Sequence, residues 1–162
     1  MKLYLNGSWR AVEIDDYVPI SSSGVPIGAF SQKGKMWISL LEKAYLKAHG
    51  GYDFDGSLSS RDLFIFTGWL PENIDLKTYD KDKLWRRIYN GYHNRDCLIT
   101  CGTGNIEDEE RIGLVSGHAY AVLEIIEAHG VRMLLLKNPW GHLSFKGKFS
   151  VHDERSWTPQ LK

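Results

Sequence analysis

Cysteine is scarce in this 162-residue chain, which has only Cys97 and Cys101. Two thiols this close in sequence cannot build the disulfide framework of a small secreted protein, so we expect a reducing, cytoplasmic compartment. An excess of charge of one sign is also lacking, because 20 lysines and arginines balance 20 aspartates and glutamates. Binding to nucleic acid or to an anionic membrane surface needs a basic excess, and we expect neither.

Long hydrophobic runs are missing as well. The aliphatic or aromatic runs are short, such as 63–66 and 133–136 with about four residues each, whereas a membrane-spanning helix needs ~20. The apolar stretch at the N-terminus is too short for a signal peptide. A hydrophobic content of 43% with six tryptophans indicates a folded globular protein. The chain opens almost directly in a predicted strand, so we expect one domain over residues 1–162 that is truncated at both ends.

The apolar pattern predicts helices in the first part of the chain and strands in the second. The predicted elements are a hairpin around Asn6-Gly7, a loop over 15–35, a helix over 36–48, a short helix capped by Ser60, a helix capped by Asp80 with an apolar stripe to Tyr92, and strands over 97–101, 118–126, 131–137 and 145–149. Helices followed by an antiparallel sheet predict the α+β fold class.

The two long strands of this pattern bring a histidine toward an asparagine. With a three-residue loop at 127–129, cross-strand partners sum to 256, which sets His118 opposite Asn138 on one face. An asparagine carbonyl can accept the Nδ1 proton of the imidazole, which is the orienting role of the third member of a Cys-His-Asn set. On spacing alone, a structural histidine near a strand end and an ordinary Asn-Pro turn explain the same residues.

Several short motifs follow one another along the chain. They are IDD at 14–16, WISLLEKAY at 37–45, GGY at 50–52, TGW at 67–69, LIT at 98–100, GLVSGHAYAV at 113–122 and KNPWG at 137–141. In this order they resemble the second, His/Asn-bearing protease subdomain of calpains, over nearly the whole chain. GGYDF at 50–54 and WTP at 157–159 are similar to the atypical, PalB-like branch that lacks EF-hands.

This resemblance implies a papain-like second lobe with N-terminal helices packed on a twisted antiparallel β-sheet or half-barrel. It implies that His118 is the general base, that Asn138 orients it, and that Trp140 covers their hydrogen bond. The implied function is that of a cytoplasmic, calpain-like cysteine endopeptidase, a thiol protease that hydrolyses proteins or peptides. A non-catalytic calpain-like interaction module, or an unrelated α+β domain in which His118 and Asn138 are structural, are the alternatives.

The nucleophile of a calpain lies on the first subdomain in a Gly-x-Cys-Trp type motif, with an oxyanion-hole glutamine, and no such motif occurs in this sequence. Cys97 and Cys101 are typical of small, half-buried thiols in a sheet. We therefore expect the partner to be the first protease subdomain with its catalytic cysteine, and we expect this chain to be inactive alone.

No cofactor is expected in this chain, although calcium is possible in the full enzyme. The resemblance places second-lobe calcium ligands at Ser144 and Val151, which offer no carboxylate, while Asp153 and Glu154 nearby keep the question open. The acidic run 107–110 takes the place of a calpain loop that overhangs the cleft, and a solvated surface loop is the alternative.

Overall fold

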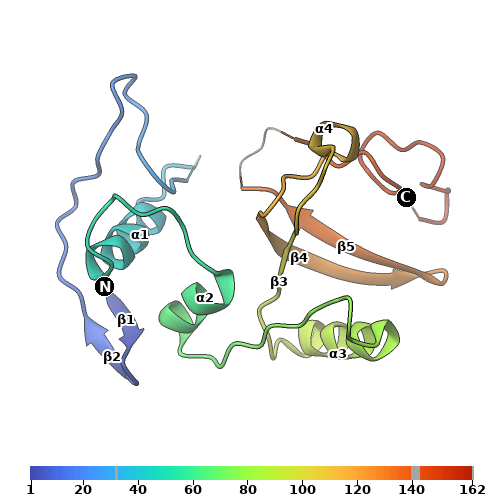
Figure 1. Cartoon of the computed structure of the whole chain (residues 1–162), viewed down its shortest axis with the longest axis horizontal. Coiled ribbons are helices and arrows are strands. Elements are labelled where there is room, and N and C mark those ends of the chain that lie inside the picture. The colour runs from blue at the N-terminus through green and yellow to red at the C-terminus, as the bar shows by residue number, and fades with distance from the viewer. Residues whose placement is uncertain (32, 140–142, 162) are drawn as a thin grey trace. The chain divides into compact units, whose positions relative to one another are not determined.

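The structure is a computed structural model that describes residues 1–31, 33–139 and 143–161. It divides into two compact units, Met1–Asn73 and Ile74–Lys162, each with helices and an antiparallel sheet (Figure 1). The predicted α+β class is therefore confirmed, whereas a single domain over 1–162 stays a prediction. Among the described residues, no helix has the length and apolar character needed to cross a membrane.

The first unit opens with the predicted hairpin. Strands β1 (Lys2–Leu5) and β2 (Ser8–Ala11) pair antiparallel, with Leu5 opposite Ser8. Asn6 and Gly7 have φ values of 50° and 76°, which is the type I′ turn that suits the twist of two paired strands.

Helices α1 (Trp37–Ala48) and α2 (Ser59–Thr67) complete the first unit, and α2 packs against β1. The prediction that Ser60 caps α2 is wrong, because extended backbone at Leu58 lets the helix begin at Ser59. The helix ends as predicted at Gly68, whose φ is 72°. The buried core of this unit comes from β1, α1 and α2, and its members are Leu3, Ala44, Tyr45, Leu46 and Ile65.

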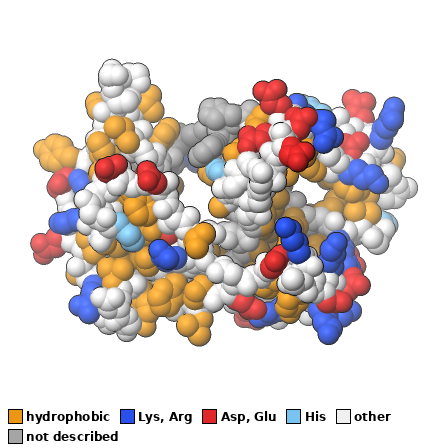
Figure 2. All heavy atoms as spheres, in the orientation of Figure 1, with side chains coloured by type: hydrophobic (Ala, Val, Ile, Leu, Met, Phe, Trp, Pro, Cys, Tyr) orange, Lys and Arg blue, Asp and Glu red, His pale blue; other side chains and the backbone are white. Residues whose placement is uncertain are grey.

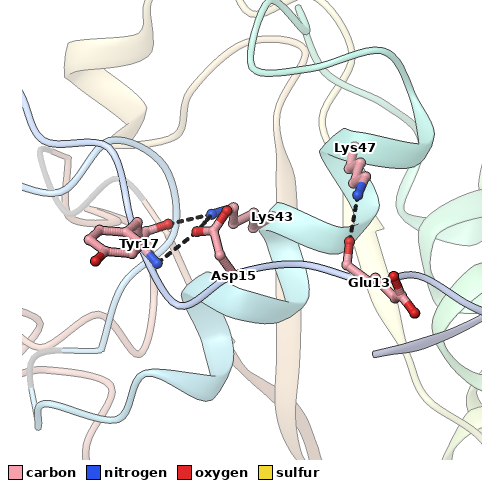
Figure 3. Close-up of polar contacts among 5 residues, drawn as sticks. All are labelled: Glu13, Asp15, Tyr17, Lys43 and Lys47. Atoms are coloured by element: carbon pink, nitrogen blue, oxygen red, sulfur yellow. Dashed lines mark hydrogen bonds and ion pairs between the residues drawn. The ribbon is translucent and has the colours of Figure 1, made fainter.

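Two lysines of α1 hold the backbone around residues 13–17, where the predicted 15–35 loop begins, against the helix (Figure 3). Lys43 Nζ forms an ion pair with Asp15 and donates to the backbone oxygen of Tyr17 at 2.5 Å, while Lys47 Nζ donates to the Glu13 oxygen at 2.6 Å. The hydrogen bond from Lys43 is the main reason that the pKa of Asp15 is lowered.

The second unit is a helix packed on a three-stranded antiparallel sheet. Helix α3 (Lys81–Asn94) is capped as predicted by Asp80, whose side chain accepts from the Lys83 amide at 2.7 Å. The strands β3 (Thr100–Gly102), β4 (Ala119–Ala128) and β5 (Val131–Lys137) lie in the order β3-β4-β5. Tyr92 and His93 of α3 reach backbone oxygens of β4, beside the fully buried Ile125.

Three sequence predictions in this unit are wrong in detail. The strand predicted at 97–101 is instead Thr100–Gly102, and 145–149 forms no strand, with Phe149 at a φ of 63°. The β4–β5 turn has two residues, His129 and Gly130, rather than three, because both adopt positive φ as a type I′ turn requires. A bulge between Val122 and Glu124 then shifts the register again.

Candidate active site

His118 and Asn138 come together at one end of the β4–β5 hairpin. His118 directly precedes β4, Asn138 directly follows β5, and His118 Nε2 lies 3.2 Å from Asn138 Oδ1. Continuing the Ala121–Lys137 register by one residue sets Asn138 across from Tyr120, so His118 is a diagonal neighbour on the same face. The predicted proximity is present, but the predicted directly opposed register is wrong.

The nitrogen that faces the asparagine also differs from the expectation. We expected Nδ1, and the structure places Nε2 there. A diagonal partner is farther away than a directly opposed one, and Nε2 is the ring nitrogen farther from the backbone. With Oδ1 as acceptor, Nε2 carries the proton and Nδ1 carries the lone pair.

The loop before His118 is held by close backbone contacts. Helix α4 (Glu109–Ile112) ends at Gly113, whose φ is 77°. A Cβ at Gly113 would lie 1.9 Å from the Ser144 oxygen, so only glycine permits this approach. The Lys146 amide donates to the Ile112 oxygen at 3.0 Å, which ties the segment after the Asn-Pro motif to α4.

The acidic run 107–110 has a structural part in this loop. Asp108 caps α4 by accepting from the Arg111 amide at 3.0 Å, and Glu109 Oε1 accepts from the Ser116 amide at 2.8 Å. Acidic side chains gather over α4 in Figure 2. The run therefore anchors the approach to His118 and also presents exposed carboxylates.

Sequence reasoning missed two further residues that contact the histidine. The ring of Tyr120 stands edge-on to the imidazole, with centroids 5.1 Å apart, and its hydroxyl accepts from the Val115 amide at 2.8 Å. Thr103 bonds the backbone of His118 through both its amide and its hydroxyl. The register of β3 against β4 would have revealed Thr103, but β3 was predicted too far upstream.

Both cysteines are half-buried free thiols. Burial raises the pKa of Cys101, and burial together with the Asp96 charge raises the pKa of Cys97. Cys97 packs against α3, where a Cβ at Gly91 would lie 2.7 Å from its sulfur, and Cys101 pairs with Tyr120 across the sheet. A raised pKa disfavours the thiolate that nucleophilic catalysis needs.

The suggested calcium positions offer little to a cation in this structure. Ser144 and Val151 are exposed. The carboxylate of Asp153 accepts from the Phe149, Arg155 and Ser156 amides at 2.8, 3.1 and 3.2 Å. Within the described ranges, no group of three or more His, Cys, Asp or Glu side chains is placed to hold a metal. Trp140 lies outside the described residues, so its predicted role stays a prediction.

Comparison with known proteins places the chain in a family. The model of the calpain family cysteine protease matches residues 1–162. Human Calpain-7 is 47% identical over 169 aligned residues, covering 100% of this chain and 21% of that protein.

Fungal relatives give the same result. The calpain-like protease palB/RIM13 of Aspergillus oryzae is 46% identical over 145 residues, covering 86% of this chain and 17% of that protein. The calpain-like protease palB of Emericella nidulans is 41% identical over the same length. The chain spans about a fifth of the length of these relatives, and the predicted resemblance to the PalB-like branch is confirmed. From the matched family model and these relatives, the chain belongs to the calpain family of cysteine proteases.

Proposed function

We propose that this chain supplies the general base, His118, and its orienting residue, Asn138, to a calpain-type cysteine endopeptidase that acts on proteins or peptides. The single observation that carries the proposal is the 3.2 Å contact between His118 Nε2 and Asn138 Oδ1. With Asn138 Oδ1 as the acceptor, Nε2 is the donor and the other ring nitrogen is left to act as the base. The family membership supports the reaction class, and the geometry of the pair supports the proposed roles.

In this mechanism, Nδ1 of His118 takes the proton of a cysteine thiol, and the thiolate attacks the carbonyl carbon of a peptide bond. The imidazolium then gives that proton to the leaving amine, and water hydrolyses the acyl-enzyme with His118 again as the base. Asn138 keeps the ring in one plane and one tautomer through both steps.

The nucleophile in this proposal belongs to the first protease subdomain, outside this chain. The raised pKa values of Cys97 and Cys101 support that assignment, because both thiols hold their protons more tightly than an ordinary cysteine. The proposal retains Trp140 as the cover of the His–Asn bond. It also retains an intracellular location, which suits two free thiols.

The test is cleavage of casein by a mixture of this chain with a separately produced first subdomain carrying the Gly-x-Cys-Trp motif. We expect cleavage by the mixture, none by the chain alone, and a loss of at least about 100-fold with His118→Ala. His152→Ala is the matched control, since His152 is an exposed histidine to which the proposal gives no role, and it should leave the rate unchanged.

Two results would contradict the proposal. Cleavage by the chain alone that disappears with Cys97→Ala or Cys101→Ala would place the nucleophile in this chain. A folded mixture that never cleaves, although its first subdomain carries an intact cysteine, would favour the non-catalytic interaction module.

A further inference from the structure

We propose that Thr103 is a positioning residue for His118. Its hydroxyl accepts the hydrogen bond from the His118 amide that a backbone oxygen of the neighbouring strand accepts in a regular sheet. The inference rests on the proposed function of His118 as the base. It assigns a role to a residue that acts through the histidine.

The register of the sheet places Thr103 directly opposite His118. Gly102 pairs with Ala119, and Thr103 and His118 each lie one position beyond that pair. A regular hydrogen-bonded pair of antiparallel residues exchanges two backbone bonds. Here one is present, from the Thr103 amide to the His118 oxygen at 2.9 Å.

The second bond runs to a side chain instead of the backbone. The His118 amide donates to Thr103 Oγ1 at 2.9 Å. The same hydroxyl donates to the Val115 oxygen at 2.6 Å, and the His118 oxygen lies 3.2 Å away. Thr103 therefore holds both ends of the 115–118 turn, in which Gly117 has a φ of 58°.

This anchoring decides where the imidazole points. The backbone of His118 sets the direction of its Cα–Cβ bond, and from there Nε2 reaches Asn138 at 3.2 Å while the Tyr120 ring stands 5.1 Å from the imidazole. Loss of the hydroxyl leaves the half-buried His118 amide without this acceptor and frees the turn. Catalytic geometry tolerates displacements of only about 0.5 Å, so a less constrained 115–118 turn should lower the rate of the reaction.

Two variants isolate the hydroxyl. Thr103→Val keeps the shape of the side chain and removes the oxygen, whereas Thr103→Ser keeps the oxygen and removes a methyl group. In the 162-residue chain labelled with 15N-histidine, NMR reads the tautomer of His118 without any catalytic partner. We expect the Nε2-protonated tautomer in the wild type and in Thr103→Ser, and a mixture of tautomers in Thr103→Val.

The mixture with the first subdomain gives a second readout. Thr103→Val should lower kcat by about 10- to 100-fold with KM within about twofold, because the expected effect is on the position of the base. Thr103→Ser should recover most of the loss, which a merely structural threonine would not require.

The result that overturns the inference is a folded Thr103→Val chain with the wild-type tautomer. If Thr103→Val does not fold, Thr103→Ala is measured instead, together with hydrogen exchange of the His118 amide in the wild type. Exchange there as fast as in an open loop also overturns the inference. An unchanged rate of cleavage by the mixture with His118→Ala, by contrast, would contradict the proposed function without affecting the tautomer result.

Discussion

Two side chains, His118 and Asn138, carry the proposed chemistry, and both lie just outside a strand end. At such positions the sheet supplies rigid anchors while the side chain stays accessible from the loop side. Several hydrogen bonds hold the loop that precedes His118. Glu109 accepts from the Ser116 amide, Thr103 donates to the Val115 oxygen, and the Tyr120 hydroxyl accepts from the Val115 amide. Each of them fixes backbone next to the base.

Asp153 provides a prediction with a defined pH dependence. Hydrogen bonds from the Ser156 side chain first, and then from the Phe149 amide, lower its pKa from the ordinary 3.8. A lowered folded-state pKa means that the ionised carboxylate stabilises the fold fully above the unfolded value, and that this contribution is lost as the pH falls through the lower folded-state value.

Asp153→Asn should therefore lower the Tm at pH 7, and its deficit relative to the wild type should shrink as the pH falls below 3.8. Thermal unfolding followed by circular dichroism at pH 7 and in acid measures both. Asp16→Asn, at an exposed aspartate of the first unit, controls for the loss of one charge. An equal deficit at every pH would show that the carboxylate acts through something other than its ionised form.

The two cysteines give a prediction about reactivity. Because both pKa values are raised, only a small fraction of either thiol is ionised near neutral pH. Alkylation of the native chain by iodoacetamide should be slow at pH 7.5 and about tenfold faster or more at pH 9, as read by mass spectrometry. The same reaction in denaturant, where burial is lost, is the control. Rapid labelling of native Cys101 at pH 7.5 would instead mark it as an activated thiol.

At the scale of elements, the second unit depends on how α3 begins and how it meets the sheet. Trp85 of α3 donates to Glu127 of β4, and Arg132 of β5 stacks over the Trp85 ring at 5.5 Å while pairing with Asp82. These contacts fix the helix against the hairpin that carries Asn138. The first part of α3 is therefore packed against the same hairpin that Asn138 follows.

Asp80→Ala should lower the free energy of unfolding by about 1 kcal/mol, within a range of about 0.5–2, because the Lys83 amide loses its acceptor. Asp80→Ser keeps a capping oxygen and should stay within a few tenths of a kcal/mol of the wild type. Urea denaturation measures both variants. A loss in Asp80→Ser as large as in Asp80→Ala would mean that the cap bond is not what stabilises the helix.

Local chemistry explains which elements were predictable. The Asn6-Gly7 turn, the Asp80 cap and the Gly68 stop each depend on one or two residues with strong conformational preferences, and all three are present. The β4–β5 register was not predictable, because it depends on a bulge near Leu123 and on positive φ at His129, which has no glycine-like preference.

The candidate site was predictable in identity but not in geometry. The motifs around His118 and Asn138 named the pair, and the pair meets despite the wrong register, because diagonal neighbours share a face as opposed ones do. Thr103 and Tyr120 were missed since their roles arise from tertiary contacts. The failed strand at 145–149 has a similar cause, because that segment bonds the end of α4 rather than a strand.

At the scale of the whole molecule, the chain corresponds to only part of each relative. It spans about a fifth of Calpain-7 and of the PalB relatives, and its second unit holds both His118 and Asn138. The proposed activity then depends on a thiol from outside this chain. If Asn138 orients His118, the histidine should increase the reactivity of that thiol before any substrate is bound.

The most direct measurement is the rate at which a thiol-directed covalent inhibitor labels the separately produced first subdomain, with and without this chain. We expect the chain to accelerate labelling by at least about tenfold, since a paired histidine raises the thiolate fraction near neutral pH. His118→Ala should abolish the acceleration and His152→Ala should preserve it. Acceleration that survives His118→Ala, or a bound complex with no acceleration, would contradict the account.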